Sequence, residues 1–220
     1  MPERKAVIVD IDNTVMSCDE RRAAICSDIL GRPVSVAEVW RDLYCSRLLT
    51  GEQQRRFFDD FLSTKLMFLD QPYPLATGTL DMLRGRGVKV IFLSGRFRSP
   101  VDKGRVTIEF MKKYGLYRED DHAIFKPSAD VFDFEFKRDA IDRLKHAYDI
   151  LWAIDDTPRS LWVSKLAGIY CLGITTSYSP LRFGFADLVV ESWEDVKAFV
   201  EGTEATEATE ATEATKDCNM

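Results

Sequence analysis

The sequence predicts an α/β fold built on a doubly wound parallel sheet, in the manner of Rossmann-like domains. Two observations carry this prediction: short apolar, β-branched segments such as "VKVIFLSG" at 88–95, and amphipathic segments that alternate with them along most of the chain. Strict alternation of strand and helix, joined by right-handed crossovers, makes the strands parallel members of one sheet. A length of 220 residues suits one domain with a modest insertion.

The first expected strand is 5–10, which is apolar almost throughout, as a strand covered on both faces should be. Residues 17–71 then carry three helical patterns without an intervening strand, so we interpret this segment as a helical insertion. Inside it, Ser35 with Glu38 fits a capping box, and Thr50 fits the N-cap of the helix that follows.

After the insertion the alternation of helix and strand resumes. The expected elements are helix 73–87, strand 88–95, helix 99–116, strand 122–126, helix 136–149, strand 150–156, helix 157–168, strand 169–174, and a last strand and helix within 187–200. Residues 201–220 contain the repeat "TEATEATEATEAT", which offers no apolar side chain larger than alanine and predicts a disordered tail.

The formal net charge of −6 is concentrated in the tail, since the last twenty residues hold six acids and one base. The rest of the chain is nearly neutral, which argues against a general attraction to nucleic acid. Five cysteines, an odd number without a CxxC pair, favour reduced thiols in a cytoplasmic protein. The chain opens without an apolar targeting region and has no run that could span a bilayer, so we expect no membrane partner.

Polar side chains follow three of the predicted strands: Asp10 and Asp12, then Ser94, Gly95 and Arg96, then Asp155 and Asp156. Ligands of a doubly wound sheet bind beyond the carboxyl ends of its strands, so these three groups should meet at one place. Several carboxylates so close together repel one another unless a cation lies among them. Hard oxygen ligands without a nearby histidine or thiol point to Mg²⁺.

A magnesium site that also offers a hydroxyl, an arginine and a lysine suits phosphoryl transfer. Asp10, at the strand end, is the expected nucleophile and would form an aspartyl-phosphate. Asp12, two residues later, could protonate the leaving oxygen and then deprotonate the water that cleaves the intermediate. These two aspartates are the predicted catalytic residues.

The motifs "DIDNT", "SGR" and "DD", in that order, resemble the haloacid dehalogenase superfamily of phosphatases over roughly residues 5 to 195. The resemblance implies a core of 1–16 and 72–200, with 17–71 as a helical cap over the active site. It also implies roles for individual residues: Asp10 and Asp12 in catalysis and at the metal (Asp12 through its backbone carbonyl), Thr14 in the turn, Ser94 on the phosphate, and Asp155 and Asp156 as magnesium ligands. Asn13 replaces the commoner glycine of this motif and tolerates left-handed backbone angles.

The superfamily places a phosphate-binding lysine near the start of the helix that leads into the third site, which favours Lys137, with Lys126 as the alternative. A closer resemblance links "IFLSGR" and the segment 136–172 to the phosphatase domain of polynucleotide kinase-phosphatases, in which Arg96 and Lys137 fall on substrate- and phosphate-binding positions. No GxxxxGK[ST] is present, so a kinase half is not expected.

A cap excludes bulk water and large polymers, so the expected substrate is a small phosphorylated metabolite or a nucleotide. The alternatives are a 3′-phosphate at a nucleic-acid end, or a superfamily member with other chemistry, such as a mutase, a dehalogenase or a binding protein. The pattern does not indicate an oligomeric state.

Two further groups of charges look like ordinary surface. The arginines of the insertion, Arg21 among them, are interleaved with acids, which is typical of a solvated, salt-bridged face. Asp130 and Asp133 form an acidic loop for which we expect no role in the site.

Overall fold

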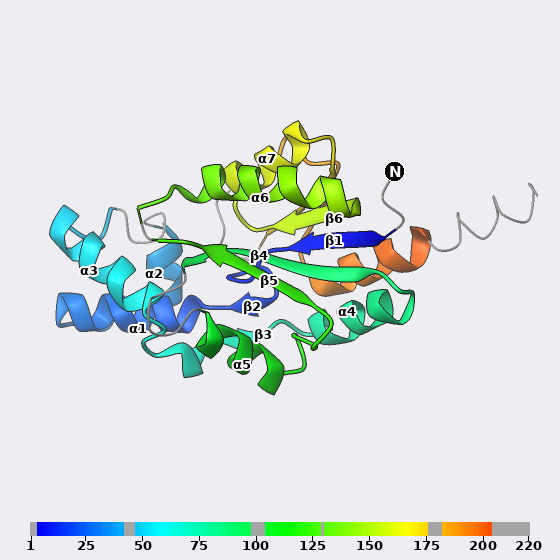
Figure 1. The fold of residues 1–220 in the computed structure, drawn as a ribbon. Helices are drawn as coiled ribbons and strands as arrows, with labels where there is room; N and C mark the ends of the chain where they lie inside the picture. Colours follow the sequence, from blue (N-terminus) through cyan, green and yellow to red (C-terminus); the bar gives the residue numbers. More distant parts are fainter. Residues whose placement is uncertain (1–3, 42–46, 98–103, 129, 176–181, 204–220) are drawn as a thin grey trace, which may run out of the picture.

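The computed structural model describes residues 4–41, 47–97, 104–128, 130–175 and 182–203. Six parallel strands form one sheet in the order β5-β4-β1-β6-β7-β8, with helices on both faces (Figure 1). The strands are β1 (Lys5–Val9), β4 (Lys89–Phe97), β5 (His122–Lys126), β6 (Asp149–Asp155), β7 (Tyr170–Ile174) and β8 (Leu188–Val190). The predicted α/β class, with its doubly wound parallel sheet, is confirmed.

Alternate residues of the central strand β1 point to opposite faces of the sheet and serve two apolar layers. Val7 and Val9 pack with α4 (Ala76–Gly85), α5 (Arg105–Lys113) and the helix at 193–203. Ala6 and Ile8 pack with α6 (Asp133–Ala147) and α7 (Pro158–Leu166) on the other face. Burial on both sides explains why this strand has no polar alternation in its sequence.

The segment between β1 and α4 leaves the sheet as a separate helical unit. It contains β2 (Met16–Ser17), α1 (Asp19–Leu30), α2 (Val36–Arg41), α3 (Gly51–Leu62), the 3₁₀ helix η1 (Met67–Leu69) and β3 (Gln71–Pro72). Because β2 and β3 pair antiparallel, the unit begins and ends at one place beside the sheet (Figure 1). Its own apolar cluster joins Ile25, Val39, Phe57 and Phe61.

At Thr50 the predicted helix-start signal is complete, whereas at Ser35 one half of the predicted capping box is present and the Glu38 carboxylate accepts from Arg32 at 2.7 Å. The Thr50 hydroxyl accepts from the backbone of Gln53, while the Gln53 side chain accepts from the backbone of Thr50, which completes a capping box. The Ser35 hydroxyl accepts from the backbone N–H of Glu38 at 3.2 Å. Each bond satisfies a donor in the first turn of a helix.

Most element boundaries differ from the sequence prediction by one to three residues; α4, for example, begins at Ala76 and not at 73. Helix α6 begins at Asp133, three residues early, because Phe132 supplies an extended N-cap and the acids of the first turn complement the helix dipole. The last helix runs to 203, so 201–203 belong to it and not to the tail. An ion pair of Lys197 with Glu201 at 3.6 Å supports that extra turn. The remaining tail residues, 204–220, and the start of the predicted helix 99–116 lie outside the described residues.

None of the helices in the described part of the chain has the length and apolar character that a membrane span requires.

Candidate active site

Three of the predicted carboxylates meet where β1 and β6 end side by side in the sheet. The backbone N–H of Asp10 donates to the carbonyl of Ile154 at 3.0 Å, which continues the pairing of the two strands to this edge. Asp10, Asp155 and Asp156 are buried, and each offers one carboxylate oxygen to a set that lies within 4.8 Å of one another. The convergence expected from the strand ends is present in the geometry.

Lys137 reaches into this cluster from the first turns of α6. Its ammonium donates to Asp10 Oδ1 and to Asp155 Oδ2, both at 2.7 Å, and its side chain is 4% exposed. Burial opposes the charge of Lys137, yet the charges of Asp10 and Asp155 raise its pKa well above the ordinary value. Of the two candidate lysines, the structure therefore brings Lys137 against the carboxylates.

The three carboxylates are poorly compensated by a single lysine. Burial raises the pKa of Asp155 to about 6, against the charge of Lys137, and burial with the charge of Asp10 raises the pKa of Asp156 to about 7. The pKa of Asp10 is also raised well above its usual range by burial, although Lys137 opposes this. Surplus negative charge on buried hard oxygens is the environment that Mg²⁺ fits. The residues present thus suit the expected metal.

Neighbouring hydroxyls fix the orientation of these carboxylates. The Thr14 hydroxyl donates to Asp10 Oδ2 at 3.4 Å and accepts from the backbone N–H of Asp156 at 3.1 Å, so it links the two strand ends. Thr157 donates its N–H to Asp155 at 2.8 Å and its hydroxyl to Asp156 at 3.0 Å. Asn13 has the left-handed backbone that its position in the turn requires, with φ of 56°.

The "SGR" motif at the end of β4 lies at the same edge. Ser94 is buried, and its hydroxyl accepts from the backbone N–H of Arg96 at 3.3 Å. At Gly95 a Cβ atom would lie 2.3 Å from Asp133 Oδ1, so a larger residue would require the Asp133 carboxylate to move. A phosphate contact for Ser94 stays a prediction.

The side chains of Asp12 and Arg96 form an ion pair with each other. The sequence prediction places Asp12 beside the metal cluster and Arg96 beside the substrate. The guanidinium donates to Asp12 Oδ2 at 2.9 Å and to Oδ1 at 2.7 Å, a bidentate contact, and Arg21 adds a third bond to Asp12 at 3.3 Å. Burial alone would raise the pKa of Asp12, but the charges of Arg96 and Arg21 outweigh it and hold that pKa well below its usual range.

Asp70, in the segment that follows η1, completes a buried group of two arginines and two aspartates. It lies 3.2 Å from Arg96 and 3.0 Å from Arg21, and burial raises its pKa to about 6. Arg21 and Asp70 belong to the helical unit, while Asp12 follows β1 and Arg96 lies near the end of β4. We call these four residues the buried ion network; it ties the helical unit to the sheet beside the carboxylate cluster.

Sequence reasoning missed three of these participants. The interpretation of Arg21 as a solvated surface arginine is wrong: it is fully buried, and its guanidinium lies 4.0 Å from the ring centre of Phe61. Asp133, for which no role was expected, lies beside the cluster: its carboxylate accepts from Ser160 at 2.8 Å and lies 3.8 Å from Lys137. Its spacing of four residues from Lys137 on one helix was the available signal. For Asp70 the sequence carried none.

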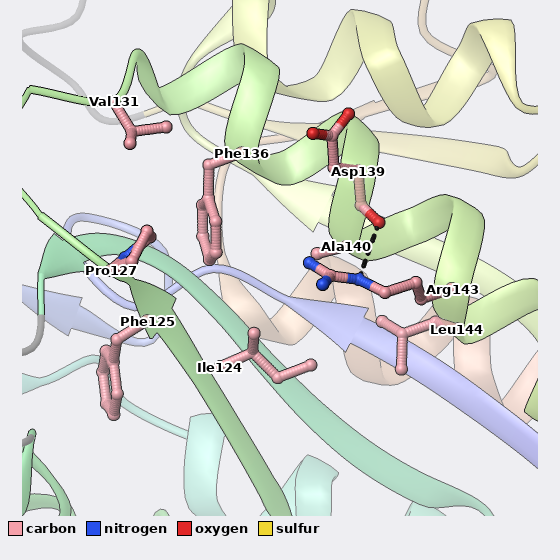
Figure 2. A pocket seen from close by; sticks show the side chains of 9 residues that line it. All are labelled: Ile124, Phe125, Pro127, Val131, Phe136, Asp139, Ala140, Arg143 and Leu144. Atoms are coloured by element: carbon pink, nitrogen blue, oxygen red, sulfur yellow. Dashed lines mark hydrogen bonds between the residues drawn. The ribbon is translucent and has the colours of Figure 1, made fainter.

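A separate groove of about 650 Å³ runs between the edge strand β5 and helix α6 (Figure 2). Its wall is apolar, with Ile124, Phe136 and Leu144, and Arg143 lies at its rim beside Asp139. None of the nine residues that line it belongs to the predicted site, so the groove and the carboxylate cluster are different features.

No model of a known protein family matches the sequence, and no curated protein matches it with significant similarity. Solved structures do match the fold. A predicted phosphatase from Clostridium acetobutylicum superposes with a TM-score of 0.66 at 13% identity, over 90% of this chain and 99% of the other. A predicted phosphoglycolate phosphatase from Haemophilus somnus gives 0.62 at 14% identity, over 91% and 99% of the two chains. A hydrolase of the haloacid dehalogenase superfamily, subfamily IA, from Geobacter sulfurreducens gives 0.58 at 17%, over 89% and 99%.

These matches place the protein in a structural class: an α/β domain with a six-stranded parallel sheet and an inserted helical unit. More particularly, its fold is the haloacid dehalogenase-like fold. At identities of 13 to 17% the likeness concerns the fold, and chemistry rests on the site itself.

Proposed function

We propose that the protein is a Mg²⁺-dependent phosphomonoester hydrolase that acts through an aspartyl-phosphate on a small phosphorylated metabolite or nucleotide. The observation that carries this proposal is the buried cluster at the carboxyl edge of the sheet, in which Asp10, Asp155 and Asp156 lie together and Lys137 donates to Asp10 and to Asp155. A nucleophilic carboxylate, a fixed cation and a set of hard oxygen ligands are what phosphoryl transfer needs.

In the first step an oxygen of Asp10 attacks phosphorus, the bond to the leaving oxygen breaks, and that oxygen takes up a proton. Lys137 holds Asp10 through a bond of 2.7 Å and offers its remaining donor capacity to the phosphate oxygens. In the second step a water oxygen attacks phosphorus and gives up a proton, and the Asp10 carboxylate and inorganic phosphate are released. Ser94 and the backbone at Gly95 would contact the phosphate in both steps.

We assign the proton transfers to Asp12. Bound to Arg96 and Arg21, its carboxylate is ionised and is not a proton donor. Donation therefore requires the Asp12 side chain to rotate from Arg96 toward the phosphate and to take up a proton there. In this proposal the buried ion network is the position to which Asp12 returns between turnovers.

A magnesium ion would be held by Asp10, Asp155 and Asp156, with the Asp12 backbone carbonyl as a further ligand, and when bound would neutralise charge on the phosphate oxygens. The excess of buried carboxylates over cations supports this assignment.

Magnesium is expected to raise the melting temperature. At 100 times the dissociation constant, ligand binding adds about 2.7 kcal/mol, or about 5–10 °C for a chain of this size. Because the pKa values of Asp155 and Asp156 are about 6 and 7, both carboxyls are ionised at pH 8 and protonated at pH 5.5, so the shift should shrink as the pH falls. Differential scanning fluorimetry at both pH values measures it.

In the same titration, Asp156→Asn should lose most of the shift and the exposed Asp142→Asn should keep it. An equal shift of the melting temperature in the two variants would show that Mg²⁺ does not bind at this cluster.

The helices α1–α3 are proposed as a cap that restricts the site to small substrates. The closer resemblance to polynucleotide kinase-phosphatases gains no support from the structural matches reported above. In addition Arg96, which it assigned to the substrate, is bound to Asp12 and Asp70. Hydrolysis of 3′-phosphates at nucleic-acid ends is therefore the second candidate, and small phosphomonoesters are the first.

The deciding experiment is phosphate release from a panel of nucleoside 5′- and 3′-monophosphates, sugar phosphates, p-nitrophenyl phosphate and a 3′-phosphorylated oligonucleotide, with Mg²⁺ and with a chelator. Mg²⁺-dependent turnover of a small phosphomonoester supports the proposal. Turnover of the oligonucleotide alone would favour the second candidate, and no turnover on any member would overturn the phosphatase assignment for these classes.

A further inference from the structure

A stacked aromatic pair lies at the start of α6. The rings of Phe132 and Phe134 have centroids 6.1 Å apart with planes inclined by 29°, and the guanidinium of Arg159, from α7, lies 4.0 Å over the ring of Phe134. Phe134 is half-buried and packs against the apolar layer of α6 and α7, whereas Phe132 is 66% exposed. One ring is thus anchored and the other is presented to solvent.

This group adjoins the carboxylate cluster. Asp133, between the two phenylalanines, lies 3.8 Å from the ammonium of Lys137 and accepts from Ser160 at 2.8 Å, and Ser160 follows Arg159 on α7. Figure 1 shows that α6 starts at the same edge of the sheet at which β4 and β5 end. Phe132, the N-cap of α6, thus precedes Asp133 at the edge of the sheet where the carboxylate cluster lies.

A single exposed phenylalanine needs no explanation, since apolar atoms make up much of any protein surface. A paired ring with an arginine stacked on it, beside a proposed phosphate site, is a different arrangement. An exposed aromatic face stacks on planar rings, and an arginine at its edge adds a charge that attracts a phosphate ester. A nucleobase joined to a phosphate has both features, whereas a simple sugar phosphate lacks the planar ring.

We propose that Phe132, Phe134 and Arg159 form a stacking platform for the base of a nucleotide whose phosphate lies at Asp10 and Lys137. The inference rests on the proposed phosphatase function and narrows its substrate class to base-bearing phosphomonoesters. Base stacking on the platform and phosphate contacts at the cluster together position the bound substrate. Because the platform contacts the base and not the reacting phosphate, it contributes to KM more than to kcat.

Adenosine 5′-monophosphate and ribose 5′-phosphate form a matched pair of substrates, because they differ by the base. In Phe132→Ala, KM for the nucleotide should rise about 10-fold, the effect of losing one stacked base, with kcat changed less than about twofold. KM for ribose 5′-phosphate should stay the same. Phe132→Tyr keeps the ring and should restore the KM of the nucleotide, and Leu166→Ala, at a residue 70% exposed near the end of α7, is the control.

A binding measurement separates failure of the platform from failure of the phosphatase proposal. Isothermal titration of the Asp10→Asn chain, with and without Phe132→Ala, uses the two 5′-compounds, adenosine 3′-monophosphate and a 3′-phosphorylated dinucleotide. Base-bearing ligands should bind more tightly than ribose 5′-phosphate, and Phe132→Ala should abolish the difference, whether or not turnover is seen. Comparison of the mononucleotides with the 3′-phosphorylated dinucleotide shows whether the platform takes the base of a free nucleotide or that of a nucleic-acid end. Equal affinity for ligands with and without a base, or no effect of Phe132→Ala, would overturn the platform.

Discussion

Substitution of Asp10 by asparagine is expected to lower kcat for phosphomonoester hydrolysis by about 10⁴-fold or more, because an uncharged amide is a poor nucleophile and the covalent step has no substitute. The amide keeps the size of the carboxylate and still accepts from Lys137, which remains paired with Asp155 at 2.7 Å. Burial already disfavours the charge of Asp10, so its removal should leave the melting temperature within a few degrees of the parent. Phosphate release and thermal denaturation, on one preparation, measure both effects.

Asp139→Asn is the matched control for this experiment. Asp139 lies on α6, two residues after Lys137, and its side chain is 61% exposed. The same chemical change at that position should leave kcat unchanged. Turnover by Asp10→Asn above about one hundredth of the parent rate would rule out the covalent mechanism.

The convergence of the carboxylates could be predicted because it follows from the arrangement of parallel strands in the sheet. Asp10 and Asp155 end apolar segments, and parallel neighbours bring their carboxyl ends to one edge whatever the details of packing. Lys137 could be predicted only as one of two lysines, through the resemblance. The site contains Lys137 because α6 packs its first turns against the ends of β1 and β6, a contact between distant segments that no local pattern reports.

The buried ion network was beyond the reach of sequence reasoning for a physical reason. Arg21 and Asp70 lie in the helical unit, whereas Asp12 follows β1 and Arg96 lies in β4, so the pairing depends on how the unit sits on the sheet. In sequence, an arginine flanked by acids looks like a solvated residue whether or not tertiary structure buries it. The burial of Arg21 under Phe61 and the neutral total of two cations and two anions emerge from packing alone.

Substitution of Arg96 by glutamine should destabilise the protein by about 3–5 kcal/mol, or about 10 °C in melting temperature, because removal of one partner leaves buried charge uncompensated. Asp12 would keep only the bond of 3.3 Å from Arg21, and the fully buried Asp70 would share that same cation. The matched control is Arg56→Gln, whose partner Asp28 is as exposed as Arg56 itself, at 53%. Such surface pairs contribute about 0–1 kcal/mol. Thermal denaturation followed by circular dichroism compares the two variants, and equal melting temperatures would contradict the role assigned to the network.

The pH dependence of this difference in melting temperature identifies which carboxylate is left uncompensated when Arg96 is removed. Asp70 already has a pKa raised by burial to about 6, and removal of a neighbouring cation raises it further. An acid whose pKa is higher in the folded state binds more protons when folded. Its unfavourable effect on stability is therefore absent below the unfolded pKa, grows between the unfolded and the folded pKa, and is constant above the folded pKa. The part of the gap in melting temperature that comes from Asp70 should therefore be large at pH 8 and small at pH 5. The part that comes from Asp12, whose pKa Arg96 holds well below its usual range, should remain at both pH values. Adding Asp70→Asn should close most of the gap at pH 8, because it removes the uncompensated charge directly. A gap that is the same at both pH values, and that persists in the double variant, would mean that Arg96 stabilises the fold through Asp12 or through packing and not through the charge of Asp70.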